Sequence, residues 1–298
     1  MKQTDEFARY HPVVNLLYFV FVLGFSMVLR HPVYQGISLL CAVTYSLRCT
    51  GRRGLLFSLK YALPLICLTA LINPAFNHEG VTILCYLPLG NPLTLESILY
   101  GISAGVMFAT VLLWFTGVNR VFTTDKCVYL FGRVLPSLSL LLSMTLRFIP
   151  RFHRQIETVK ETQKCLGADT ENGALFARMK NALRVFSVVV TWSLENSIET
   201  ADSMKSRGYG LGRRTAYSIY RFEERDKVVL GTILALGIPV LCGAIAGGAA
   251  FRFYPSVRIA AFSPVNCLLQ AAYFALCSIP VMLNWKEDAA WNAIRSGT

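Results

Sequence analysis

Six long stretches with almost no charged residues decide what this chain can fold into. They are 13–29, 31–47, 54–76, 95–118, 228–251 and 259–285. A helix needs about 20 apolar residues, and at least about 17, to cross the hydrocarbon core of a bilayer. It also satisfies its own backbone hydrogen bonds there, which an isolated strand cannot do. The first two stretches are marginal in length and form either a tight hairpin or one broken helix. The sequence therefore predicts an all-α polytopic membrane protein with about six transmembrane helices.

The distribution of charge divides the chain into three parts. Only 15% of the residues are charged, whereas a soluble domain usually carries about 25%. The segment 119–227 holds 18 of the 29 Lys and Arg residues and 11 of the 17 Asp and Glu residues. Because a charge at the bilayer centre costs about 2.5 to 3.5 kcal/mol, we expect most of this segment to lie outside the hydrocarbon. The predicted parts are N-terminal transmembrane helices in 1–118, a cytoplasmic or interfacial region in 119–227, and C-terminal transmembrane helices in 228–298.

The same charges predict the orientation in the membrane. Basic segments stay on the cytoplasmic side, so we place 119–227 and the basic loop 48–60 in the cytoplasm. The loop 73–94 contains no Lys or Arg and is placed outside. Six spans then put both termini in the cytoplasm of a multi-pass plasma-membrane protein. This placement accounts for the basic net charge, and contact with lipid headgroups is the simple interpretation of Arg213 and Arg214. We expect no nucleic-acid partner, because no binding motif for one occurs.

One motif permits an enzymatic interpretation. The run Gly101-Ile-Ser103-Ala-Gly105 matches the G-x-S-x-G pattern around a nucleophilic serine. An intramembrane serine hydrolase would need a base within hydrogen-bond reach of Ser103, and the four histidines lie at span ends or in loops. Gly101 and Gly105 also form a small-xxx-small face that lets helices approach closely. We favour the packing interpretation and keep the hydrolase as an alternative.

Other classes of function lack their usual residues. No G-x-x-x-x-G-K-[ST] motif is present, so the chain is not expected to bind ATP phosphates in that manner. The span interiors carry almost no ionisable residues, which speaks against an ion-coupled transporter and leaves an ATP-independent permease as an alternative. The nine cysteines are scattered without C-x-x-C spacing. We therefore expect no metal site and no cofactor.

The segment 119–227 contains several helix candidates. The stretch 134–149 is apolar, carries Arg147 and ends at Pro150, where we expect a kink or a break because proline lacks an N–H group. The stretch 155–166 is amphipathic and is followed by Gly167, a residue that commonly ends helices. Two further candidates are 175–192 and 193–207, the second of which stops at Gly208.

The two glycine-terminated helices end in similar sequences, KCLGAD at 164–169 and KSRGYG at 205–210. Cations in a last helical turn can simply balance the helix dipole. The repetition of a cationic, glycine-capped end indicates more, because an exposed arginine on a rigid helix end is a common interface anchor. We predict a docking surface for a cytoplasmic partner. Its candidate residues are Lys164, Gly167, Asp169, Ser206, Arg207 and Gly208, with Arg147, Pro150, Lys205 and Tyr209 as interface and hinge positions.

Several segments resemble a known family. They are His11-Pro12, NPAFNHEG at 73–80, LESILYG at 95–101, the run TTDKCVYLFGRVLPSLSLLLSMTLRFIPRF at 123–152, and SMKSRGYG at 203–210 followed by Arg214-Thr215. In this order they resemble the transmembrane T component of energy-coupling factor (ECF) transporters, the CbiQ-like family. The resemblance covers most of residues 10–227.

The resemblance implies a non-catalytic scaffold within an ABC importer. In that family two cytoplasmic coupling helices end in Ala-Arg-Gly motifs that insert into two ATP-binding-cassette ATPase subunits. The apolar helices hold a membrane-embedded substrate-binding S component, which takes up a vitamin or a transition-metal ion such as cobalt or nickel. By position, the second motif is Ser206-Arg207-Gly208. The first would be Cys165-Leu166-Gly167, which lacks the arginine, so that only Gly167 and Asp169 fit, or Lys164 takes the role.

Overall fold

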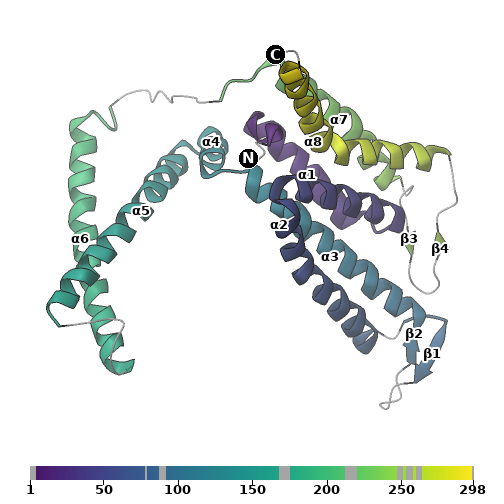
Figure 1. Ribbon diagram of the computed structural model, residues 1–298, viewed down its shortest axis with the longest axis horizontal. Coiled ribbons are helices and arrows are strands. Elements are labelled where there is room, and N and C mark those ends of the chain that lie inside the picture. The colour runs from purple at the N-terminus through teal and green to yellow at the C-terminus, as the bar shows by residue number, and fades with distance from the viewer. Residues whose placement is uncertain are drawn as a thin grey trace. The chain divides into compact units, whose positions relative to one another are not determined.

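The computed structural model describes residues 5–77, 79–86, 92–167, 175–211, 220–246, 251–252, 258–259 and 264–296. These residues are almost entirely helical (Figure 1). The helices are η1 (Glu6–Arg9), α1 (Pro12–Val28), α2 (Pro32–Phe76), α3 (Leu95–Val121), α4 (Thr124–Val134), α5 (Pro136–Cys165), α6 (Leu175–Ser206), α7 (Glu224–Ile245) and α8 (Pro264–Ser296). Two antiparallel ribbons complete the fold, namely β1 (Ile83–Tyr86) with β2 (Pro92–Thr94), and β3 (Phe251–Arg252) with β4 (Arg258–Ile259).

The chain forms two compact units. The first contains Met1–Lys126 together with Tyr220–Thr298, and the second contains Cys127–Ile219. In the first unit, α2 packs along α3 and α8, and α7 packs along α8 and α1. Its core is rich in fully buried aromatic side chains, with Trp114 beside Tyr18 and Tyr273 beside Phe25 at centroid distances of 6.1 and 6.0 Å.

Among the residues that the structure describes, four helices of the first unit are long and apolar enough to cross a membrane. They are Gly54–Phe76, Leu95–Val121, Glu224–Ile245 and Pro264–Arg295. The chain is thus a multi-pass membrane protein by helix length and composition. A fifth apolar helix, Pro12–Val28, is shorter at 17 residues. The count of six spans stays a prediction.

The first two apolar stretches form separate helices, α1 and α2. Each begins at a His-Pro pair, and proline at the first helical position has its backbone already preset for a helix. The Nδ1 atoms of His11 and His31 accept hydrogen bonds from the N–H groups of Val13 and Val33, both at 3.3 Å. The two histidines therefore cap the helices that their prolines begin.

The basic segment 48–60 is not the loop that we expected. It stays helical inside α2 except at Gly51, where φ is 73° and ψ is −178°. Only glycine adopts this backbone conformation without steric cost. One glycine therefore interrupts the helix and accommodates the charged residues without a long connection.

The small-residue interpretation of Gly101 and Gly105 is confirmed by the packing of α3 against α2. A Cβ atom at Gly101 would lie 2.8 Å from the carbonyl oxygen of Thr69, and one at Gly105 would lie 2.8 Å from the Cα of Ile66. Both distances are shorter than any real Cβ contact. The two glycines permit this close approach of the helix backbones.

The second unit contains longer helices than the sequence predicted. The predicted kink or break at Pro150 is wrong as to the break, because helix α5 continues through this residue, and the kink stays a prediction. Pro150 is exposed, and the carbonyl that loses its helical partner there can bond to solvent instead. Helix α6 likewise joins the predicted helices 175–192 and 193–207 into one helix of 32 residues.

Candidate partner-docking site

Helices α5 and α6 cross and pack against each other (Figure 1). Val159 of α5 forms a small buried cluster with Val185 and Val189 of α6. Phe152 lies before Val159 on α5, and its ring packs edge to face against Trp192, which lies after Val189 on α6. The ring centroids are 5.7 Å apart and the ring planes make an angle of 81°. Because residues later in α5 meet residues earlier in α6, the two helices run antiparallel. Their C-terminal ends therefore point in opposite directions along the pair.

The C-terminus of α6 is closed by a Schellman motif. The N–H of Gly208 donates to the carbonyl of Lys205, and the N–H of Tyr209 donates to the carbonyl of Met204, both at 3.0 Å. Gly208 has φ of +84°, the left-handed conformation that this motif requires. The sequence-predicted end at Gly208 is confirmed.

The side chains around Gly208 are accessible. Ser206 and Arg207 are exposed, Tyr209 is 49% exposed and Leu211 is 85% exposed. In the part of the chain that the structure describes, Arg207 forms no ion pair. A guanidinium held at a fixed helix end can bind a carboxylate through two parallel hydrogen bonds. This end of α6 can therefore present the cations of Lys205 and Arg207, two hydroxyl groups and an apolar side chain to a partner.

The C-terminus of α5 shares the left-handed glycine and the first hydrogen bond of this motif. The N–H of Gly167 donates to the carbonyl of Lys164 at 3.0 Å, and Gly167 has φ of +78°. Lys164 and Leu166 are exposed beside it. Asp169, the remaining candidate of this end, lies outside the described residues. Arg207 directly precedes Gly208, whereas Leu166 directly precedes Gly167. Lys164 is the nearest described cation to that position at the end of α5.

The hinge and interface candidates lie at two different places. Lys205 and Tyr209 flank Arg207 at the end of α6. Arg147 and Pro150 lie in the middle of α5, where the Arg147 guanidinium sits 5.8 Å from the ring centroid of its neighbour Phe148. The structure therefore does not place Arg147 and Pro150 at a helix end.

An exposed apolar stripe runs along α6 and was not predicted from the sequence. At alternating spacings of three and four residues, it consists of Phe176, Met179, Leu183, Phe186 and Val190. The first four of these side chains are largely exposed, and Val190 is 38% exposed. The face of α6 that packs on α5 is a different one, since it carries Val185, Val189 and Trp192. The signal for a second apolar face was the heptad-like spacing, which is typical of a helix that packs against another helix.

Several curated proteins with related sequences carry the name energy-coupling factor transporter transmembrane protein EcfT. The relative from Bacillus selenitireducens is 31% identical over 112 residues, covering 37% of this chain and 42% of the relative. The one from Lacticaseibacillus paracasei is 34% identical over 100 residues, covering 33% and 38%. The one from Listeria innocua is 26% identical over 226 residues, covering 69% and 80%. The chain is a homologue of these EcfT proteins.

This homology confirms the resemblance that the sequence motifs indicated. No protein-family profile matches the chain. The matched part spans about two fifths of the length of the first two relatives, at 42% and 38%. The shared name describes a transmembrane protein of a transporter and does not describe an enzyme.

The environment of Ser103 gives no support to the hydrolase alternative. Its Oγ donates a hydrogen bond to Oε1 of Gln35 at 2.9 Å. An amide oxygen cannot take up the proton that a serine nucleophile must lose. Among the described residues, no cluster of His, Cys, Asp and Glu side chains could hold a metal ion.

Proposed function

We propose that this chain is the transmembrane T component of an ECF-type ABC importer. In this proposal it is a non-catalytic scaffold that transmits ATP-driven motion of two ATP-binding-cassette ATPase subunits to a membrane-embedded S component. The observation that carries the proposal is the pair of glycine-capped helix ends at Gly167 and Gly208, present in a homologue of EcfT proteins.

The end at Gly208 is proposed as the stronger of the two docking contacts. Arg207 serves as the charged anchor, and Gly208 permits the backbone of a partner to approach closely. The Schellman hydrogen bonds hold the backbone beside the anchor in one conformation, which lowers the entropic cost of binding. The end at Gly167 offers Lys164 instead of an arginine, and an ammonium group pairs less well with a planar carboxylate. The two ATPase contacts are therefore proposed to be unequal.

The crossing of α5 and α6 supports a mechanical role. Its buried valines and the contact between Phe152 and Trp192 resist sliding, because packed side chains interlock. A force applied by an ATPase at one helix end is thereby passed to the other helix. The exposed apolar stripe of α6, from Phe176 to Val190, is the surface that we assign to the S component.

In the proposed arrangement the second unit faces the cytoplasm of a prokaryote. The strong excess of cations in 119–227 supports this side of the membrane. The transported substrate is a vitamin or a transition-metal ion, and the S component selects it. ATP hydrolysis belongs to the ATPase subunits and not to this chain.

Purification of the tagged chain from the membranes of its own bacterium, in mild detergent, tests the proposal. Two ATP-binding-cassette subunits and a small membrane protein should co-purify in a defined ratio and be identified by mass spectrometry. Isolation of the chain without any ATPase would contradict the proposal. A second arm tests the permease alternative, because the purified chain alone in liposomes should transport nothing.

A further inference from the structure

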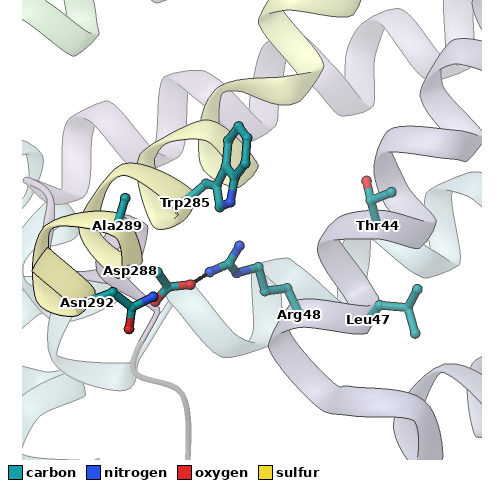
Figure 2. A pocket seen from close by; sticks show the side chains of 7 residues that line it. All are labelled: Thr44, Leu47, Arg48, Trp285, Asp288, Ala289 and Asn292. Carbon is teal, nitrogen blue, oxygen red and sulfur yellow. Dashed lines mark ion pairs between the residues drawn. The ribbon is translucent and has the colours of Figure 1, made fainter. Parts of the chain in front are cut away.

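A pocket lies between α2 and α8 in the first unit, and none of the docking residues described above lines it. It has a volume of about 620 Å³. Figure 2 shows the side chains that line it, which are Thr44, Leu47, Arg48, Trp285, Asp288, Ala289 and Asn292. The size lies within the range of small-molecule sites, about 300 to 1,000 Å³.

Both helices place this pocket at the level of the lipid headgroups. Helix α8 has 33 residues, while the hydrocarbon core requires only about 20. Its apolar part ends at Trp285, a residue type enriched at the membrane interface, and Lys286, Glu287 and Asp288 follow directly. In α2, Arg48 is the first Lys, Arg, Asp or Glu after the apolar stretch 31–47. The apolar part of α2 and the apolar part of α8, which are far apart in the sequence, therefore both end at this pocket.

The pocket presents one positive and one negative group together. The guanidinium of Arg48 forms an ion pair with the carboxylate of Asp288, drawn as a dashed line in Figure 2. Arg48 also donates to the carbonyl of Asn284 at 3.4 Å. The two paired side chains are still 22% and 46% exposed, so a bound molecule can reach both charges. A simple anion would be repelled by Asp288, and a simple cation would be repelled by Arg48.

Apolar side chains lead from the ion pair along the two helices. Leu40, Thr44 and Leu47 share one face of α2 because they are spaced four and three residues apart, and both leucines are exposed. On α8, Met282 and Trp285 share a face in the same way and are also exposed. These two faces can hold the acyl chains of a lipid whose headgroup lies in the pocket.

We propose that this pocket binds the headgroup of a zwitterionic phospholipid of the phosphatidylethanolamine class. The phosphate would pair with Arg48 and the ammonium with Asp288, while the exposed indole of Trp285 provides a face for the ammonium through a cation–π contact. A headgroup with both charges matches the ion pair without leaving either partner unpaired. The proposal does not depend on the transport function proposed above.

The experiment measures which lipid stays bound to the full-length chain. The purified protein is delipidated, incubated with equal amounts of phosphatidylethanolamine and phosphatidylglycerol of identical acyl chains, and analysed by native mass spectrometry. The wild type should retain the ethanolamine lipid several-fold more than the glycerol lipid. Asp288→Asn and Arg48→Gln should each abolish this preference. The matched controls Glu287→Gln and Arg52→Gln change neighbouring charges that do not line the pocket, and they should keep it.

Thermal unfolding in detergent shows whether each variant is folded. If the loss of the ion pair unfolds the protein, Trp285→Ala serves as the second variant, because Trp285 is exposed and removes no core contact. It should reduce the retention of the ethanolamine lipid. Equal retention of both lipids by the wild type, or an unchanged preference in all three pocket variants, would overturn the proposal.

Discussion

The backbone N–H of Tyr209 donates to the carbonyl of Met204 at 3.0 Å and closes the last turn of α6 around Gly208. Together with the hydrogen bond from the N–H of Gly208 to the carbonyl of Lys205, this contact fixes where the helix ends and holds the backbone beside Arg207. The proposed docking role depends on that geometry as much as on the charge of the arginine.

Gly208→Ala should loosen the end of α6. Gly208 adopts the left-handed conformation, with φ of +84°. For a residue with a Cβ atom, this conformation is about 1 to 2 kcal/mol less favourable. The amide of Tyr209 should then exchange its hydrogen at least several-fold faster in hydrogen-exchange mass spectrometry. Gly231→Ala is the control, since a Cβ atom there meets nothing within 4 Å, and it should leave this exchange unchanged. Equal exchange in Gly208→Ala and the wild type would show that the cap does not depend on glycine.

Gly105→Val should separate α3 from α2. The added Cβ would come within 2.8 Å of the Ile66 Cα, and overpacking of this kind costs about 1 to 3 kcal/mol. We expect a lower unfolding temperature in detergent. Gly36→Val, in the same bundle, has open space around its Cβ and should change the unfolding temperature much less. Equal effects of the two variants would contradict the close-packing role of Gly105.

The buried Lys126 should make stability depend on pH in the alkaline range. Its Nζ donates to the carbonyl of Ala8 and the side chain is only 4% exposed. Burial lowers the pKa of Lys126 to about 8, although the negative charge of Asp5 partly raises it. A lysine in an unfolded chain has a pKa of about 10.4. Between these two values the unfolded chain binds more protons than the folded one, so the contribution of Lys126 to stability rises with pH.

The measurement compares the wild type with Lys126→Met, which has no titrating group at this position. The unfolding temperature of the wild type, relative to that of the variant, should increase between about pH 8 and pH 10. Taking the difference removes the titration of tyrosines and cysteines common to both proteins. A difference that stays flat across this range would contradict a lowered pKa for Lys126.

Ser103→Ala should leave partner binding and transport unchanged. The substitution removes only the hydrogen bond to Gln35 and should cost about 1 kcal/mol of stability. Partner retention is measured after purification, and stability by thermal unfolding. Complete loss of function in a folded Ser103→Ala protein would return the hydrolase alternative to consideration.

Local chemistry explains which parts of the fold could be predicted from the sequence. The helix ends near Gly167 and Gly208 were predicted correctly because a left-handed cap requires a specific residue. Pro150 was misleading, since a proline has helical φ and an exposed helix can tolerate one missing hydrogen bond. The β1–β2 ribbon was not predicted, because its short strands contain few residues and gain stability mainly from each other.

In the candidate site, too, only the features that depend on neighbouring residues in the sequence could be predicted. The cationic ends of α5 and α6 are visible in the sequence because they are local. The spacing of the residues from Phe176 to Val190 is visible in the sequence, but their exposure is not. It follows from the structure, in which α5 packs against a different face of α6. The pairing of Arg48 with Asp288 joins residues far apart in the chain, and no local pattern indicates it.

The most direct measurement counts the ATP-binding-cassette subunits that co-purify with Arg207→Glu. Quantitative mass spectrometry would compare this variant with the wild type, with Lys164→Glu, and with Arg154→Glu, which places the same charge change on an exposed position within α5. The account predicts strong loss of ATPase from Arg207→Glu, a smaller loss from Lys164→Glu and none from Arg154→Glu, with all four proteins inserted in the membrane. Full retention of the ATPases by Arg207→Glu would contradict the docking role of the α6 end.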